Sequence, residues 1–139
     1  MDKRKKSFLG MIKHRKKWLY FLPAFLYYAL IFFLSSRSYQ TKVEVPFFDK
    51  FLHLLEFAGL GFLLSLGFYA RDVSLKSRFG LVFSIGLILS GLDELHQFFV
   101  PMRYMDGFDL IADMIGVITG FFVFIFISRK LKWNHSRDS

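Results

Sequence analysis

The chain has 139 residues, of which 54% are apolar and 20 are phenylalanine, and its mean hydropathy is +0.39. This composition is unlike that of a soluble domain of the same length and predicts one small integral membrane domain. The absence of cysteine excludes disulfides, iron–sulfur clusters and thiol nucleophiles. The formal net charge of +8 favours binding to one of two negatively charged partners, nucleic acid or anionic lipid.

Four apolar stretches approach the roughly 17 to 25 residues that cross a ~30 Å hydrocarbon core. They are residues 18–34, 51–69, 79 to about 100, and about 108 to 127. The first stretch follows a basic segment, as in a signal peptide, but no small-residue cleavage site follows it, so we expect a retained first helix. The sequence therefore predicts an all-α fold, an integral membrane bundle of four transmembrane helices.

The basic residues predict how the four spans are oriented. Fifteen of the 19 Lys and Arg residues lie in the two tails and the middle loop, and four lie in the other two loops. By the positive-inside rule, residues 1–17 and 128–139 form basic cytoplasmic tails around a membrane domain at 18–127. Topology and attraction to anionic lipid headgroups then account for the charge, and we expect no nucleic-acid partner.

Acidic and amide side chains lie within or beside the last three predicted spans. A carboxylate in a transmembrane helix costs about 2.5 to 3.5 kcal/mol on insertion scales, so several are tolerated where they face one another or water. With the predicted topology they all converge at the outer end of the bundle. These residues are Asp49, Glu56, Asp93, Glu94, Gln97, Asp106, Asp109 and Asp113.

Helical spacing separates the candidates for function from the rest of this group. Five residues are candidates for an acid/base or polar site: Glu56, Asp93, Glu94, Asp109 and Asp113. Four more are candidates for binding: Lys50, His53, Gln97 and Arg103. Arg103 and Lys50 are expected to engage a phosphate. The carboxylates would supply acid/base groups or hold a hard divalent cation through oxygen ligands.

Structural explanations compete with each of these roles. A polar network that fixes one register of the bundle would account for Asp93, Glu94, Asp109 and Asp113 without any ligand. Capping and the helix dipole explain Asp106, but they do not explain Asp113, a full turn inside its helix. Gly116 and Gly120 are expected to permit close helix packing, and His96 is expected to be interfacial.

Three groups of residues carry a resemblance to a known family. They are DKFLH at 49–53 with EF at 56–57 and LGFLL at 60–64, DELHQF at 93–98 with Pro101 and Arg103, and Asp109 with Asp113 and Gly116. In this combination the chain, from about residue 18 to 127, resembles the VanZ-like family of small bacterial membrane proteins, named for a member associated with reduced teicoplanin susceptibility. Met102 and Asp113 depart from the family pattern, in which Gly and often Asn stand at these positions.

The resemblance implies a multi-pass protein of the bacterial cytoplasmic membrane with a role in the cell envelope. We therefore expect a polar site near the outer leaflet that binds or modifies the headgroup of an envelope lipid or a lipid-linked wall precursor. The alternatives are a non-catalytic membrane scaffold and, third, a proton-linked lipid transporter. Metalloprotease chemistry is not expected, since no His-Glu-x-x-His is present. Catalysis, metal and oligomeric state stay open.

Overall fold

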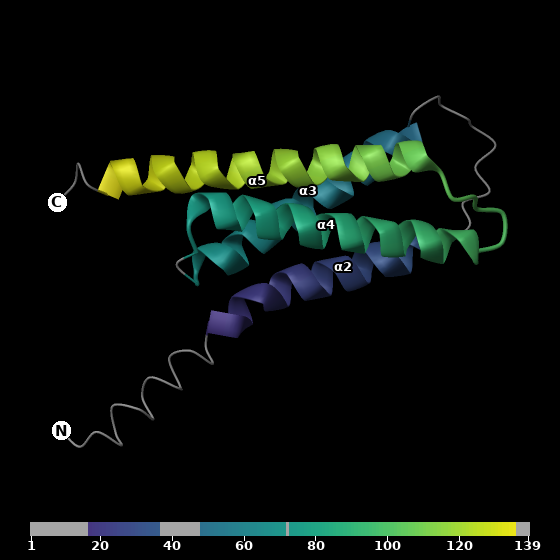
Figure 1. The fold of residues 1–139 in the computed structure, drawn as a ribbon, viewed down its shortest axis with the longest axis horizontal. Coiled ribbons are helices and arrows are strands. Elements are labelled where there is room, and N and C mark those ends of the chain that lie inside the picture. Colours follow the sequence, from purple (N-terminus) through teal and green to yellow (C-terminus); the bar gives the residue numbers. More distant parts are fainter. Residues whose placement is uncertain (1–16, 37–47, 72, 136–139) are drawn as a thin grey trace, which may run out of the picture.

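The computed structural model describes residues 17–36, 48–71 and 73–135, with side chains up to residue 131. These residues form a 3-10 turn, η1 (Leu19–Phe21), and four α-helices that pack side by side (Figure 1). The helices are α2 (Leu22–Ser35), α3 (Phe48–Tyr69), α4 (Leu75–Phe98) and α5 (Gly107–His135). No strand occurs in this part of the chain, so the all-α prediction is confirmed. Most of the predicted N-terminal tail lies outside the described residues.

Three helices are long and apolar enough to cross a membrane: α3, α4 and α5 as far as Leu131. The first predicted span, residues 18–34, corresponds to the helical segment Leu19–Ser35, which is also apolar but shorter. Large apolar side chains cover the outside of the molecule, as the 69% exposed fractions of Phe25 and Phe126 show. A surface of this kind is typical of a protein whose helices face lipid.

The helix boundaries differ from the predicted spans in ways that affect the polar residues. α3 begins at Phe48, three residues earlier than predicted, so Asp49 and Lys50 lie in its first turn. α4 ends at Phe98, ahead of Pro101, which cannot donate a backbone hydrogen bond. α5 continues well past residue 127, because Lys and Arg are good helix formers.

Close packing of α3 against α5 depends on glycine. At three positions an added Cβ would meet a backbone carbonyl oxygen of the facing helix, which has no room to move. These positions and the facing residues are Gly61 with Val117, Gly116 with Leu54, and Gly120 with Ala58. The prediction that Gly116 and Gly120 serve packing is confirmed, and the two helices approach as small-residue contacts in membranes allow.

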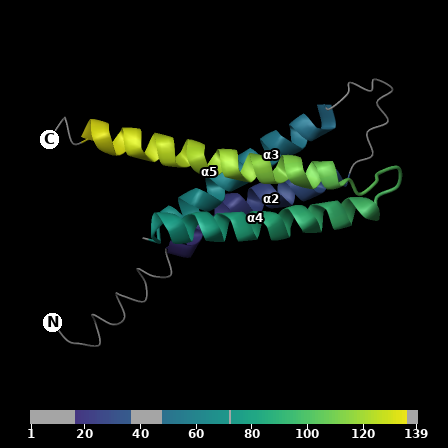
Figure 2. The same cartoon turned by 45° about the horizontal axis from the view of Figure 1, so that its top comes forward.

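The topology brings the polar ends of three helices together. α2 begins and α5 ends at one end of the molecule, whereas α3 begins, α4 ends and α5 begins at the other (Figures 1 and 2). Between the two ends lies an apolar core that includes Phe57, Leu60, Val82, Val117 and Phe121. The helix ends that carry the acids of the sequence therefore meet around one volume, beyond the apolar core.

Candidate functional site

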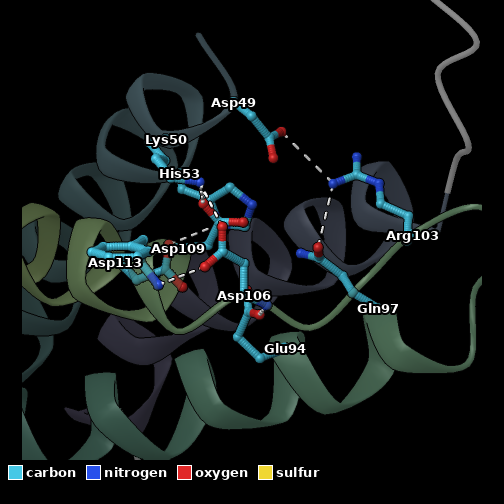
Figure 3. Close-up of polar contacts among 10 residues, drawn as sticks. Asp49, Lys50, His53, Glu94, Gln97, Arg103, Asp106, Asp109 and Asp113 are labelled. Carbon is cyan, nitrogen blue, oxygen red and sulfur yellow. Dashed lines mark hydrogen bonds and ion pairs between the residues drawn. The ribbon is translucent and has the colours of Figure 1, made fainter. Parts of the chain in front are cut away.

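The polar residues of α3, α4, α5 and the α4–α5 loop form one cluster at this end of the molecule (Figure 3). We call it the polar cluster. Its members are Asp49, Lys50, His53, Glu56, Ser90, Asp93, Glu94, Gln97, Arg103, Asp106, Asp109 and Asp113. All nine residues predicted for the site belong to it.

The most deeply buried part of the cluster is a chain of three side chains from three helices. Ser90 Oγ donates a hydrogen bond to Asp113 Oδ2 at 2.7 Å, and Asp113 Oδ1 lies 2.9 Å from His53 Nδ1. Asp113 and Ser90 are fully buried, and His53 is 4% exposed. The partners of Asp113 explain how a carboxylate a full turn inside α5 is tolerated, because both of its oxygens are hydrogen-bonded.

A second group surrounds the amino terminus of α5. Lys50 Nζ on α3 donates hydrogen bonds to Asp106 Oδ2 at 2.7 Å and to Asp109 Oδ1 at 2.9 Å. Asp106 also caps α5, since its Oδ1 accepts from the backbone N–H of Phe108 at 2.9 Å. The hydrogen bond from Lys50, followed by the one from Phe108, holds the pKa of Asp106 below its ordinary value.

A third group lies along the end of α4 and the loop after it. Gln97 Nε2 donates to Asp93 Oδ2 at 2.9 Å, and Gln97 Oε1 accepts from Arg103 Nη1 at 3.3 Å. The same Arg103 nitrogen lies 3.8 Å from Asp49 Oδ1. Arg103 therefore reaches from the loop to α3 and α4, and Figure 3 shows its guanidinium at the edge of the cluster.

Glu94 connects α4 to the second group. Its Oε2 accepts a hydrogen bond from the backbone N–H of Asp106 at 2.9 Å, and the side chain is 1% exposed. Two buried carboxylate oxygens, Glu94 Oε1 and Asp93 Oδ1, have no hydrogen-bond partner among the described residues. Glu56 is half-buried and lies close enough to His53 and Asp93 for their charges to interact.

A comparison with protein families shows to which family this chain belongs. The family model described as VanZ/LLP1 matches residues 11–128, which is most of the chain. The chain belongs to the VanZ/LLP1 family. Comparisons with curated proteins and with solved structures give no match. The motifs on which the resemblance rested supply much of the polar cluster, so the chemistry to be explained in this VanZ/LLP1 protein lies at one end of its bundle.

A groove on the side of the bundle adjoins the cluster. It lies between α3 and α5, has a volume of about 430 Å³ and is almost entirely apolar. Its lining consists of Phe51, Leu54, Phe108, Ile111, Ala112 and Ile115, together with Lys50. Lys50 is thus shared: its stem lines the groove and its ammonium group hydrogen-bonds to two acids of the cluster.

The two basic residues lie among the acids, as sequence spacing predicted. Lys50 is hydrogen-bonded to Asp106 and Asp109, and the expectation that Lys50 and Arg103 engage a phosphate stays a prediction. The sequence did not predict a site role for Ser90 or Asp106. Ser90 hydrogen-bonds to Asp113, and the backbone N–H of Asp106 hydrogen-bonds to Glu94. The signal for Ser90 was its place on the α4 stripe that also carries Asp93 and Gln97.

The arrangement limits the chemistry of the cluster. Ser90 donates its hydrogen bond to a carboxylate rather than to an imidazole, so it lacks the adjacent base that activates a nucleophilic serine. His53 held by Asp113 is the pairing that orients an imidazole for proton transfer. His96 lies apart from both, stacked on Phe32 with ring centroids 3.9 Å apart and hydrogen-bonded to Ser36.

Proposed function

We propose that this VanZ/LLP1 protein binds the headgroup of an envelope lipid or a lipid-linked wall precursor in the polar cluster, at the outer leaflet. The observation that carries the proposal is the junction of the apolar groove with the cluster at Lys50. A ligand with an apolar chain and a polar head matches this junction, because the chain would lie in the groove while the head reaches the acids.

The groups around the junction fit such a headgroup. Carboxylates accept hydrogen bonds from the hydroxyl and ammonium groups of a saccharide or peptide. Arg103 has five guanidinium donors in a planar fork, and its contact with Asp49 is long, at 3.8 Å. A phosphate that replaced Asp49 would gain a bidentate partner without removing a short hydrogen bond. Binding of a wall precursor would link the cluster to glycopeptide susceptibility.

The test measures ligand binding and membrane abundance together. Purified protein in lipid nanodiscs is titrated with a polyprenyl diphosphate that carries a wall saccharide, and with the same polyprenyl diphosphate without the saccharide. The Arg103→Ala, Asp109→Asn double variant should bind the full precursor about tenfold or more weakly, since lost hydrogen bonds to charged groups are worth about 1.5 to 3 kcal/mol. Arg129→Ala, on the exposed far part of α5, is the matched control.

A groove variant tests the apolar half of the proposal. Ile111→Trp should fill the space between α3 and α5 and weaken both polyprenyl ligands to a similar extent. The double variant should also weaken both, because both carry the phosphate proposed to meet Arg103, and it should weaken the ligand with the saccharide further, because that ligand also loses the Asp109 carboxylate. In cells, the double variant at unchanged abundance should lose any effect of the protein on teicoplanin susceptibility. If the double variant binds the full precursor as tightly as the wild type does, the proposal is overturned.

One observation favours the scaffold as the second candidate. Lys50, His53 and Arg103 each already contact a carboxylate of the protein, as expected if the cluster serves folding or partner choice. The scaffold predicts that the same substitutions lower abundance or assembly and that neither polyprenyl ligand binds. A transporter receives less support, because the buried acids of the described helices all lie at one end of the molecule.

A further inference from the structure

The polar cluster contains more acid than its basic residues neutralise. Two permanent cations, Lys50 and Arg103, and one histidine, His53, face seven carboxylates. These carboxylates belong to Asp49, Glu56, Asp93, Glu94, Asp106, Asp109 and Asp113. Buried carboxylates repel one another at low dielectric, so an excess of this size requires bound protons or a bound cation.

The excess is concentrated in the interior of the cluster. Lys50 pairs with Asp106 and Asp109, and Arg103 lies beside Asp49. Asp106 and Asp49 are nearer the surface, with exposed side-chain fractions of 38% and 56%, and the buried Asp109 has Lys50 as its partner. The other buried acids are Asp93, Glu94 and Asp113, and His53 is the only basic side chain that bonds to any of them among the described residues.

Three interior residues offer ligand atoms at the spacing of a metal site. One ring nitrogen of His53 and one carboxylate oxygen each of Glu94 and Asp113 all lie within 4.8 Å of one another. His53 Nδ1 and Asp113 Oδ1 are 2.9 Å apart, close to the ~3.0 Å between neighbouring ligands of an octahedral ion with bonds of about 2.1 Å. Small side-chain rotations would therefore bring the three atoms onto one ion.

Apart from His53, the surrounding donors bind only one oxygen of each of the two carboxylates. Ser90 holds Asp113 by Oδ2, and the backbone N–H of Asp106 holds Glu94 by Oε2. The remaining oxygen of Glu94, Oε1, is buried and has no hydrogen-bond partner among the described residues. A carboxylate fixed through one oxygen and open at the other is the arrangement that outer-shell hydrogen bonds give to metal ligands.

We propose that His53, Glu94 and Asp113 bind a divalent first-row transition metal ion. One imidazole with two carboxylates suits Mn²⁺ or Zn²⁺, whereas Ca²⁺ and Mg²⁺ prefer sites made of oxygen alone. The ion supplies the positive charge that the interior of the cluster lacks. It replaces the proton that His53 and Asp113 would otherwise share, and it does not depend on the proposed headgroup binding.

A neighbouring set of residues has similar spacing but a poorer environment for a cation. Asp49, His53 and Asp109 also offer ligand atoms within 4.8 Å of one another. Asp109 is already hydrogen-bonded to Lys50, and Asp49 lies beside Arg103. Two permanent positive charges next to these ligands would repel a metal ion, so the interior set is favoured.

The test uses the full chain, purified without a polyhistidine tag, freed of metal with a chelator and titrated with Mn²⁺. Free Mn²⁺ is followed by its electron paramagnetic resonance signal, and bound metal is counted by elemental analysis. We expect one Mn²⁺ per chain, displaced by Zn²⁺. His53→Gln and Glu94→Gln should abolish saturable binding, and Ser90→Ala, which keeps all three ligands, should weaken it about 10- to 100-fold.

Two controls separate this site from nonspecific binding and from misfolding. His96→Gln removes a histidine on the same face of the membrane domain that contacts Phe32 and Ser36, and it should bind Mn²⁺ as the wild type does. Elution in detergent and thermal unfolding check that each variant is folded. Equal Mn²⁺ binding by wild type and folded His53→Gln, or no binding by either, would overturn the metal site. Headgroup binding could persist in both cases.

Discussion

Asp106 makes the contacts on which several parts of the cluster depend. Its carboxylate accepts hydrogen bonds from Lys50 on α3 and from the first turn of α5, while its backbone N–H donates to Glu94 on α4. Capping was foreseen for this residue from its position before a helix. The two contacts to other helices were not, because they depend on how the loop places the residue in space.

The lowered pKa of Asp106 predicts a pH-dependent contribution to stability. A carboxylate with a depressed folded-state pKa stabilises the fold above its ordinary pKa of about 3.9, and this contribution is lost as the pH falls through the folded-state value. Asp106→Asn keeps a good capping residue but removes the charge that pairs with Lys50. It should cost about 0.2 to 1 kcal/mol at pH 7, since the side chain is 38% exposed.

Thermal unfolding in detergent between pH 7 and pH 3 checks this prediction. The difference between wild type and Asp106→Asn should begin to shrink as the pH falls below the ordinary pKa of the carboxyl group, because the wild-type unfolded state then binds a proton before the folded state does. A difference that stays constant over the whole range would mean that the charge of Asp106 contributes nothing.

At the residue scale, spacing along a helix predicted membership of the cluster but not the pairing within it. The steps between Asp106, Asp109 and Asp113 fix which face of α5 they share. Whether Lys50 meets these acids or a ligand depends on the rotation and height of α3 relative to α5, which no local pattern encodes. Met102 is a similar case: its φ of 64° shows a left-handed turn that a glycine would adopt without strain.

The elements that hold the cluster together are α3 and α5, and glycine sets the distance between them. Gly116 and Gly120 follow Asp109 and Asp113 on one face of α5, so the same face carries the acids and the closest helix contact. The close glycine contacts next to the acids fix the position of His53 along the helix axis relative to Asp113. The polar contacts and the glycine contacts are therefore two parts of one interface.

Gly120→Ala should separate the roles of backbone approach and helix propensity. Its Cβ would meet the backbone oxygen of Ala58, so α3 and α5 must shift, and overpacking of this kind typically costs about 1 to 3 kcal/mol. Gly80→Ala is the matched control, because nothing lies within 4 Å of an added Cβ on this exposed part of α4. There the better helix propensity of alanine should raise stability slightly.

Thermal unfolding of the two variants in the same detergent gives the comparison. Gly120→Ala should unfold several degrees below wild type and Gly80→Ala at or above it. Equal values for the two variants would show that the close approach at Gly120 has no energetic importance.

At the scale of the whole molecule, composition was the most informative part of the sequence. Apolar runs of membrane-spanning length predicted the helices, and Pro101 predicted the end of α4, because both signals are local. The early start of α3 was missed, since Asp49 and Lys50 interrupt the apolar run although they are helical. Hydropathy reports what faces lipid, whereas these two residues pair with charged side chains of the polar cluster.

The topology of the bundle predicts which loops are accessible from each side of the membrane. The excess of Lys and Arg in the tails and the middle loop predicts that the α4–α5 loop and the polar cluster lie outside the cell. The chain contains no cysteine, so single introduced cysteines report accessibility without background. Tyr104 in the α4–α5 loop and Leu75 at the start of α4 are exposed, by 84% and 46%.

In intact cells, a membrane-impermeant maleimide should label Tyr104→Cys and leave Leu75→Cys unlabelled until the membrane is permeabilised. The two sites lie at opposite ends of α4, so labelling from one side alone also shows that this helix crosses the membrane. The reverse pattern would place the polar cluster in the cytoplasm, where it could not meet a precursor headgroup in the outer leaflet. Labelling of both residues in intact cells would contradict the crossing of α4 itself.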